Sequence, residues 1–301
     1  MPISQRDVRN RISSVKNIEK ITRAMEMVAA ARLRRAEQRI EALRPYAGAI
    51  RRMTREAAEA AGHVPRLPIL SEHDQVRNVG LLLVAGDRGL AGGFNSNIVR
   101  AGVAAGREQE GQGRSAVYFA SGRRPASSIR FRGLELADSF TGFTDRPAYA
   151  DARRIAERVM SAFVDEEVDQ VDVFYNGYVS PISQVVRHET LLPLQQASVL
   201  GEQESEEEQE DEPRHRAEVE YEPGPEEILE RLIPDYVEVS IYRALLESTA
   251  SEHGARMTAM RNATDNAGEL ITQLTLEMNR ARQAEITQEI MEVVAGAEGV
   301  G

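Results

Sequence analysis

The stretch MTAMRNATDNAGELITQLTLEM, from Met257 to Met278, decides the fold. Its apolar and small residues recur at alternating steps of three and four, which is the spacing of a coiled-coil seam. The seam positions are Met257, Met260, Thr264, Ala267, Ile271, Leu274 and Met278. Methionine, threonine and alanine replace most of the leucine and isoleucine of a tight zipper, so the seam is thin and soft. We therefore predict a long helix over residues 226–297 that packs along a partner, with a frayed tail in GAEGVG.

The partner helix is predicted at the other end of the chain, over residues 4–60. This stretch is rich in alanine, arginine, glutamate and methionine, all of them good helix formers. Ser4 is the expected N-cap, with Asp7 as the acidic half of a capping box. Apolar residues again recur at steps of three and four, at Val8, Ile12, Val15, Ile18, Ile21, Met25 and Val28. The step from Val15 to Ile18 comes one residue early, which predicts that the seam shifts around the helix.

Two helices at opposite ends of a chain can pair only as an antiparallel hairpin, with the intervening residues at its base. At 1.5 Å per residue the N-terminal helix reaches roughly 80 Å, far beyond one compact domain. Pro45 is expected to kink or interrupt this helix, and Pro234 is a candidate break in the C-terminal helix. The predicted architecture is a rod attached to a globule.

Between the two helices, short apolar runs alternate with helical ones. The strand candidates are Val79–Val84, Ala116–Ala120, Val171–Tyr175 and Gln184–Leu192, and the helix candidates are Asn95–Glu110 and Pro147–Asp165. This alternation predicts an α/β sandwich with a mainly parallel sheet. The predicted domains are an N-terminal shaft helix at 1–60, an α/β globular domain at 75–200, an acidic linker at 201–225 and a C-terminal shaft helix at 226–301.

Charge is distributed unevenly along the chain, whose net charge is −11. Residues 1–60 carry 14 basic and 7 acidic side chains, whereas residues 201–225 carry 2 and 11. The acidic segment has prolines and almost no apolar residues, so we expect a disordered or solvated linker. A basic face is formed by Arg32, Arg34, Arg35, Arg39, Arg51, Arg52 and Arg55. Because no aromatic residues are interleaved with this face and the protein is acidic overall, acidic protein surfaces are favoured over nucleic acid as its partner.

One glycine-rich segment follows a predicted strand and opens a predicted helix, the position of a dinucleotide-binding loop. It runs LLLVAGDRGLAGGFNSNIVR from Leu81 to Arg100, with glycines at Gly86, Gly89, Gly92 and Gly93. The spacing is not G-x-G-x-x-G, and the segment has no lysine for a Walker loop. Asn95 and Ser96 are expected to cap the helix without a ligand. A tight structural turn is favoured, with nucleotide binding as the alternative.

No catalytic, cofactor-binding or metal-binding residue can be assigned. The chain has no cysteine, its five histidines never fall at the close spacing of a metal site on one helix, and no G-x-S-x-G elbow is present. Paired carboxylates lie mostly in 201–225, and Glu166–Glu167 and Glu226–Glu227 are typical of solvated helix faces. No apolar run approaches the ~18 residues of a membrane span, and the N-terminus lacks the apolar core of a signal peptide. A soluble intracellular protein is therefore expected.

Four segments have sequences that helix and strand propensity do not explain. They are ISSVKNIEKITRAMEMVAAARLRRA, DRGLAGGFNSNI, ALLESTASEHGARMTAMRNATDNAGELI and NRARQAEITQEIMEVVAGA, in that order along the chain. Together they resemble the gamma subunit of F-type ATP synthases. The resemblance covers nearly the whole chain, and its terminal motifs are highly specific, whereas the glycine-rich motif alone is not.

The resemblance implies an antiparallel coiled coil that threads a hexameric catalytic head, with a Rossmann-like globule near the membrane rotor. It implies that Met25 faces the head, and that Arg256, Arg282, Gln283 and Thr287 touch loops of the catalytic subunits. The implied function is a rotor shaft without an active site, which couples transmembrane proton flow to ATP synthesis or hydrolysis. The implied partners are the alpha and beta subunits of the head, the epsilon subunit and the membrane ring of c subunits. The implied location is peripheral, at the cytoplasmic face of the bacterial plasma (inner) membrane.

Two departures from the family and two rival functions stay open. The acidic segment 201–225 is longer and more charged than in the family, and the cysteine pair of the light-regulated plant form is missing, so no thiol switch is expected. One rival is a nucleotide-binding enzyme that uses Gly86–Gly93. The other is a structural coiled-coil adaptor that does not rotate.

Overall fold

The computed structural model describes residues 5–61, 68–70, 73, 75–194 and 224–298 of the 301-residue chain. Two compact units divide it, one of Met1–Ala31 with Arg256–Gly301 and the other of Arg32–Ala255. Helices α1 (Gln5–Ala61) and α6 (Pro225–Glu298) each contribute to both units. The predicted division into 1–60, 75–200, 201–225 and 226–301 stays a prediction. Ser4, the expected N-cap, and most of the acidic segment lie outside the described residues.

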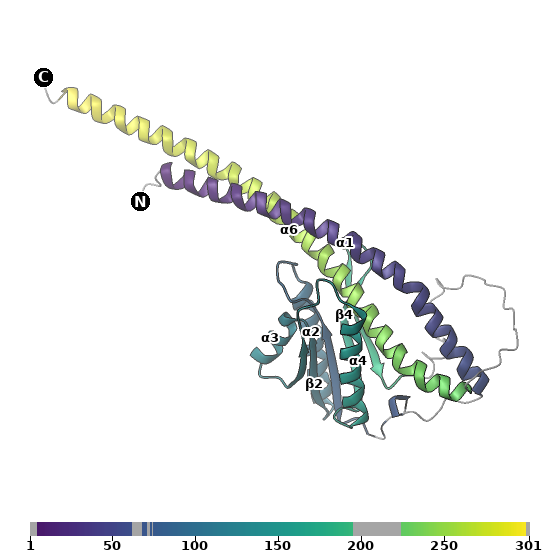
Figure 1. Cartoon of the computed structure of the whole chain (residues 1–301). Helices are drawn as coiled ribbons and strands as arrows, with labels where there is room; N and C mark the ends of the chain where they lie inside the picture. The colour runs from purple at the N-terminus through teal and green to yellow at the C-terminus, as the bar shows by residue number, and fades with distance from the viewer. Residues whose placement is uncertain (1–4, 62–67, 71–72, 74, 195–223, 299–301) are drawn as a thin grey trace. The chain divides into compact units, whose positions relative to one another are not determined.

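In the first unit, the beginning of α1 and the last part of α6 lie side by side (Figure 1). Val8 packs in one apolar cluster with Leu274. Further along α1, Glu26 accepts a 2.8 Å hydrogen bond from Arg261 Nε. Because residue numbers fall on α6 as they rise on α1, the two helices are antiparallel, as predicted.

The seam predicted on α6 is confirmed. Met260, Thr264, Ala267 and Leu274 are buried, and Met257, Ile271 and Met278 are half-buried.

On α1 the predicted shift of the seam is wrong. After Val15 the buried or half-buried positions continue in the same seven-residue repeat, at Glu19, Thr22, Glu26 and Ala29. The apolar residues of the expected shifted seam remain outside it, with exposed fractions of 52% for Ile18, 58% for Ile21 and 54% for Val28. The reason is that a strict repeat on α6 requires the same repeat on its partner.

The interruptions expected at two prolines are also wrong, because α1 runs unbroken through Pro45 and α6 runs unbroken through Pro234. Proline inside a helix costs about 3 kcal/mol or more. Apolar burial beside both prolines opposes that cost, since Ile50 of α1 packs with Leu232 of α6 in the second unit. Each such side chain contributes roughly 1.5–3 kcal/mol when fully buried.

The second unit contains a five-stranded sheet in the order β3-β2-β1-β4-β5. The β1–β2, β2–β3 and β1–β4 pairs are parallel and the β4–β5 pair is antiparallel. The strands are β1 (Asn78–Val84), β2 (Ser115–Ser121), β3 (Leu136–Phe140), β4 (Gln170–Tyr178) and β5 (Gln184–Leu192). All four predicted strands are present, and the mainly parallel sheet is confirmed. Edge strand β3 was missed because its sequence, LADSF, contains polar residues and buries only Phe140.

Helices cover both faces of this sheet. They are α2 (Phe94–Gly111), α3 (Arg123–Phe131), α4 (Tyr149–Val164) and the short 3-10 helix η1 (Pro68–Leu70), together with the parts of α1 and α6 that belong to this unit. The two predicted helices correspond to α2 and α4. Helix α3 was missed because it is short and has Pro125 in its first turn.

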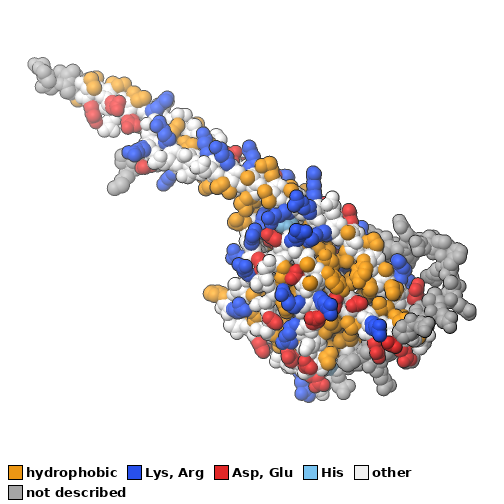
Figure 2. Space-filling model, viewed as in Figure 1, with side chains coloured by type: hydrophobic (Ala, Val, Ile, Leu, Met, Phe, Trp, Pro, Cys, Tyr) orange, Lys and Arg blue, Asp and Glu red, His pale blue; other side chains and the backbone are white. Residues whose placement is uncertain are grey.

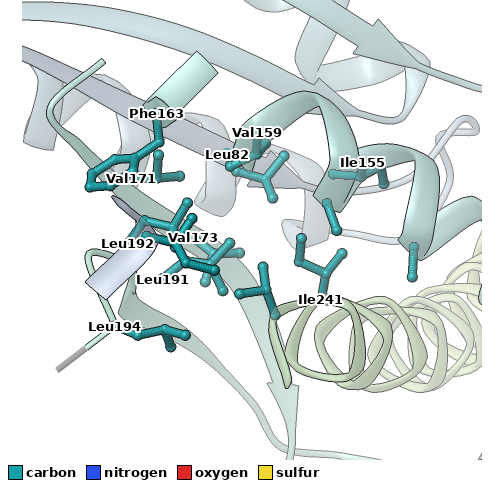
Figure 3. Close-up of a cluster of buried hydrophobic side chains, with 14 of the residues drawn as sticks. Leu82, Ile155, Val159, Phe163, Val171, Val173, Leu191, Leu192, Leu194 and Ile241 are labelled. Atoms are coloured by element: carbon teal, nitrogen blue, oxygen red, sulfur yellow. The ribbon is translucent and has the colours of Figure 1, made fainter. Parts of the chain in front are cut away.

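Alternation along β1 separates the two buried layers. Leu82 belongs to the cluster that α4 and α6 complete, which also contains Ile155 and Ile241 (Figure 3). Leu83 points to the opposite face, where α2 and α3 pack with Ile98 at the centre. Right-handed crossovers produce this arrangement, because the chain moves outward from β1 to β3 and then returns to the other side of β1. The result is a Rossmann-like three-layer sandwich.

We expect Gly102→Ala to destabilise the chain, because helix α2 approaches β1 most closely at this glycine. A Cβ there would lie 3.1 Å from Leu83 Cδ1, and closer still to Cδ2, inside a fully buried cluster. Overpacking of this kind costs about 1–3 kcal/mol. Denaturant unfolding of the full chain measures the change.

Gly111→Ala is the matched control, since nothing lies within 4 Å of a Cβ at this position of the same helix. Its unfolding free energy should stay unchanged or rise by roughly 0.5–1 kcal/mol. Equal stability of the two variants would contradict the close approach at Gly102.

Candidate functional site and contact surface

The candidate ligand site of this sheet is its topological switch point, where the strand order reverses. In open α/β sheets, ligands bind outside the carboxyl ends of the strands at this switch point. Here it lies between β1 and β4, because the chain builds β2 and β3 on one side of β1 and then places β4 on the other. The glycine-rich loop, residues 85–93, directly follows β1.

Helix α6 occupies this crevice. Ser248 Oγ donates a 3.4 Å hydrogen bond to the carbonyl of Val84, the last residue of β1. Ser251 Oγ donates a 3.0 Å hydrogen bond to the carbonyl of Asn176 in β4. Asn176 Nδ2 in turn donates to the carbonyl of Phe94 at the start of α2. The space that holds a dinucleotide in other Rossmann-like folds is therefore filled by this chain's own helix.

Charged side chains explain two of the loop glycines. A Cβ at Gly86 would lie 2.9–3.0 Å from the carboxyl group of Glu252, a residue only 1% exposed. A Cβ at Gly89 would lie 3.0 Å from the guanidinium of Arg124. Gly92 has a φ of +56°, a conformation that glycine adopts without strain. These glycines have structural reasons that do not involve a phosphate group.

Asp87 joins the loop to its neighbours. Its carboxylate accepts hydrogen bonds from the backbone N–H of Arg123 (3.0 Å), the backbone N–H of Gly142 (2.8 Å) and Thr144 Oγ1 (3.1 Å). Since Arg123 is the first residue of α3, Asp87 satisfies a free donor at that helix terminus. The carboxylate of Asp87 is thus used within the fold, where it holds the loop to α3 and to residues 142–144.

The helix cap expected from Asn95 and Ser96 is wrong. The N-cap of α2 is Gly93, and no side chain caps the helix. Asn95 instead accepts a 2.8 Å hydrogen bond from the backbone N–H of Gly86 and donates one of 2.9 Å to the carbonyl of Arg88. Both predicted residues lie inside the first turn of α2, where Asn95 holds the loop closed.

Ser248, Ser251 and Glu252 form a polar group that the sequence analysis did not assign. All three are buried inside α6. A signal was present in the sequence, because polar residues interrupt the apolar pattern of a long helix within the segment ESTASEHG.

The predicted contact residues lie elsewhere, mainly at the end of α6. Arg282, Gln283 and Thr287 are exposed on one stretch of this helix, and Thr287 Oγ1 donates a 2.8 Å hydrogen bond to the carbonyl of Gln283. In the described part of the chain, none of residues 282–295 is buried. Figure 1 shows why, since the yellow end of α6 continues past the start of α1 as a single helix.

The other two predicted contact residues have different surroundings. Met25 is half-buried on α1, in the same stretch as the exposed Ile18, Ile21 and Val28. Arg256 is only 9% exposed, so it presents little surface to a partner. The structure thus groups three of the five residues on α6 and places Met25 on α1, and their contacts with a partner stay predictions.

Apolar side chains on the end of α6 were missed by the sequence analysis, which assigned only Arg282, Gln283 and Thr287 in this region. Ile286, Ile290, Met291, Val293 and Val294 are between 46% and 72% exposed. Figure 2 shows hydrophobic atoms among the charged ones along the helices of the first unit. The steps of four from Ile286 to Ile290 and on to Val294 were the signal, since they place these residues on one helical face.

The described residues contain no helix long and apolar enough to cross a bilayer. They also contain no group of three or more metal-ligating side chains that could hold an ion.

Comparison with known proteins gives a consistent family. A family model described as ATP synthase matches residues 4–300. The gamma chain of ATP synthase from Rubrobacter xylanophilus is 46% identical over 297 residues, covering 99% of this chain and 98% of that protein. The gamma chain from Moorella thermoacetica is 42% identical over 298 residues, with 98% of each covered.

Solved structures agree with this assignment. A chain from the central stalk and c-ring of the Tetrahymena thermophila mitochondrial ATP synthase matches with a TM-score of 0.59 at 28% identity, covering 81% of this chain and 99% of that one. A chain of the Euglena gracilis mitochondrial ATP synthase matches with a TM-score of 0.67 at 17% identity, covering 98% and 94%, and supports the fold alone. This chain belongs to the gamma-subunit family of ATP synthase, a central-stalk component and not the catalytic subunit.

Proposed function

We propose that this gamma subunit is the rotor shaft that couples transmembrane proton flow to ATP synthesis or hydrolysis in a catalytic head. The observation that carries the proposal is the end of α6, where residues 282–295 present both polar and apolar side chains and no other described helix covers them. A face of this kind, if left in water, would expose a stripe of five large apolar residues. Insertion into a surrounding protein would bury the stripe.

The partners that we propose follow from this arrangement and from the family. The complex itself is membrane-associated. Alpha and beta subunits of the head would contact the first unit through Met25, Arg282, Gln283 and Thr287, and through the small exposed part of Arg256. The epsilon subunit and the ring of c subunits would contact other parts of the chain, at the cytoplasmic face of a bacterial plasma membrane.

The two faces of the first unit differ, as a rotor requires. On α1, Ile18, Ile21 and Val28 form an exposed apolar stripe beside Met25. On α6, the exposed residues level with this stripe include the polar Arg261, Asp265 and Glu269. Turning such a shaft inside a ring of similar subunits would present a different chemical surface to each one, so that each site experiences the shaft differently.

The two rival functions predict different measurements. A non-rotating adaptor would form a complex of fixed geometry with no ATP-dependent motion. To distinguish it from a rotor, the tagged chain is purified with its partners and the complex is tested in a single-particle rotation assay. A nucleotide-binding enzyme is opposed by α6, which occupies the switch point.

We expect the isolated chain neither to bind ATP tightly nor to hydrolyse it, because α6 occupies the crevice at the glycine-rich loop and no lysine of a Walker loop is present there. Calorimetric titration with ATP should give no micromolar binding, and phosphate release should equal that of buffer. Micromolar binding that disappears in Gly89→Val or Gly92→Val would instead support the nucleotide-binding enzyme.

Replacement of Arg282 and Gln283 by alanine should leave the isolated chain intact and weaken the complex. Both side chains are exposed, so the helix content should stay the same and the free energy of unfolding should change by no more than about 0.5 kcal/mol. In the assembled enzyme, ATP turnover and proton pumping should fall, because charge-assisted hydrogen bonds worth roughly 1.5–3 kcal/mol each are lost.

Leu274→Ala is the comparison for that double variant, since Leu274 is a buried seam residue. It should lower the stability of the isolated chain by about 2–5 kcal/mol. Wild-type turnover and coupling in the Arg282/Gln283 variant would remove these residues from the contact surface.

Met25→Lys should reduce coupling by placing a charge on the apolar stripe that we propose to face the head. Met53→Lys is a matched control, because Met53 is exposed at the same position of the seven-residue repeat on α1 but belongs to the second unit. ATP-driven proton pumping per ATP hydrolysed should fall for Met25→Lys and stay near wild type for Met53→Lys. Equal losses would show that added charge, and not its place on the shaft, is responsible.

A further inference from the structure

A set of charged and phenolic side chains joins β5 to α6 in the second unit. Both carboxylate oxygens of Glu189 on β5 are used, since Oε1 accepts a 2.5 Å hydrogen bond from Tyr175 OH and Oε2 accepts one of 2.7 Å from Arg243 Nη2. Tyr175 is fully buried on β4, and Arg243 belongs to α6. We call this set the β5–α6 latch; its members are Tyr175, Arg187, Glu189, Arg243 and Glu247.

The second arm of the latch lies one helical turn further along α6. Arg187 of β5 extends over Gly177, where a side chain would collide with its guanidinium, and its Nη1 lies 3.7 Å from Glu247 Oε2. Burial raises the pKa of the Glu247 carboxyl above its ordinary value, while Arg243, Arg187 and the backbone N–H of Tyr178 oppose that rise. Glu247 is therefore a carboxyl group whose charge depends on these neighbours.

Apolar packing alone leaves α6 free to adjust on the sheet. Its buried residues include Ile233, Val237 and Ile241, which fill the layer beneath the strands. The hydrophobic contribution of such contacts is non-directional, so small rotations or translations of the helix change it little. Charge-assisted hydrogen bonds depend strongly on distance and angle. The Glu189–Arg243 bond, whose side chains are 38% and 39% exposed, therefore adds little stability but favours one register of the helix on the strand.

We propose that the β5–α6 latch holds α6 in register on the sheet and transmits mechanical load between the two. Glu189 and Arg243 are then positioning residues of the rotor. The Glu189–Arg243 hydrogen bond and the 3.7 Å Arg187–Glu247 ion pair join an edge strand to a helix at two adjacent turns. Two such contacts resist both rotation of α6 about its axis and sliding along it. This inference rests on the proposed rotor function and adds the elements through which load enters α6.

The test compares Glu189→Gln and Arg243→Ala in the assembled enzyme, reconstituted into proteoliposomes. ATP hydrolysis without a proton gradient should stay near wild type. The ratio of protons pumped to ATP hydrolysed should fall several-fold as the opposing gradient grows, because load then pulls α6 out of register. A purely structural loss would lower hydrolysis and pumping together, whatever the gradient.

Two further variants keep the test decisive. Arg243→Lys retains the positive charge and should restore part of the coupling under load. The exchange of Glu189→Arg with Arg243→Glu keeps both charges and should do the same, so it also serves if Arg243→Ala fails to assemble. If neither variant pumps more protons per ATP under load than Arg243→Ala or Glu189→Gln, the proposal is overturned.

Arg231→Ala is the matched control on the same helix. Its 2.8 Å ion pair with Glu227 is an exposed contact within one helix, so coupling under load should stay at the wild-type value. The same loss in Arg231→Ala, or wild-type coupling under load in Glu189→Gln and Arg243→Ala, would also overturn the latch. Failure of the rotor function itself would look different, because the unmodified complex would then not pump protons at all.

Discussion

The strict seven-residue repeat on α6 is the constraint on which the first unit depends. Its seam of methionine, threonine, alanine and leucine positions never changes phase between Met257 and Met278. A partner helix can follow such a seam only by keeping the same repeat. Helix α1 therefore brings Glu19, Thr22 and Glu26 toward α6, and it leaves the neighbouring isoleucines and a valine on its outer face. The exposed apolar stripe is thus a direct consequence of the helix pairing.

Polar contacts become important once the seam is thin. Thr22 Oγ1 and Thr264 Oγ1 lie 2.7 Å apart in a buried position, and Thr264 also donates to the carbonyl of Met260. Small side chains bury little area, so their contribution to stability is modest. The hydroxyl pair favours one register of the two helices, because any other register would lose the hydrogen bond between Thr22 and Thr264 in a buried position.

The sequence predicted the elements whose apolar periodicity extends over many residues. It failed for short elements, and for the seam of α1, whose phase is set by contacts with α6. The two terminal helices and four strands follow from the spacing of apolar residues. Strand β3 and helix α3 are short, and their polar residues obscure the pattern. The phase of α1 could not be read from α1 alone, because Ile18 and Ile21 are better seam residues than Glu19 and Thr22. Only the fixed repeat on α6 excludes them.

The glycine-rich loop illustrates the same limit for the candidate site. Its glycines predict a tight turn, but the reason for Gly86 is a carboxyl group 166 positions later in the chain, at Glu252. Local sequence contains no record of such a contact. A fold that ordinarily leaves its switch point open for a ligand has here used that space to seat a helix. The crevice is where α6 is held by Ser248 and Ser251, and the β5–α6 latch holds the same helix from the neighbouring strand. The sheet therefore functions as a clamp on α6, which explains how a Rossmann-like domain can belong to a protein whose work is mechanical.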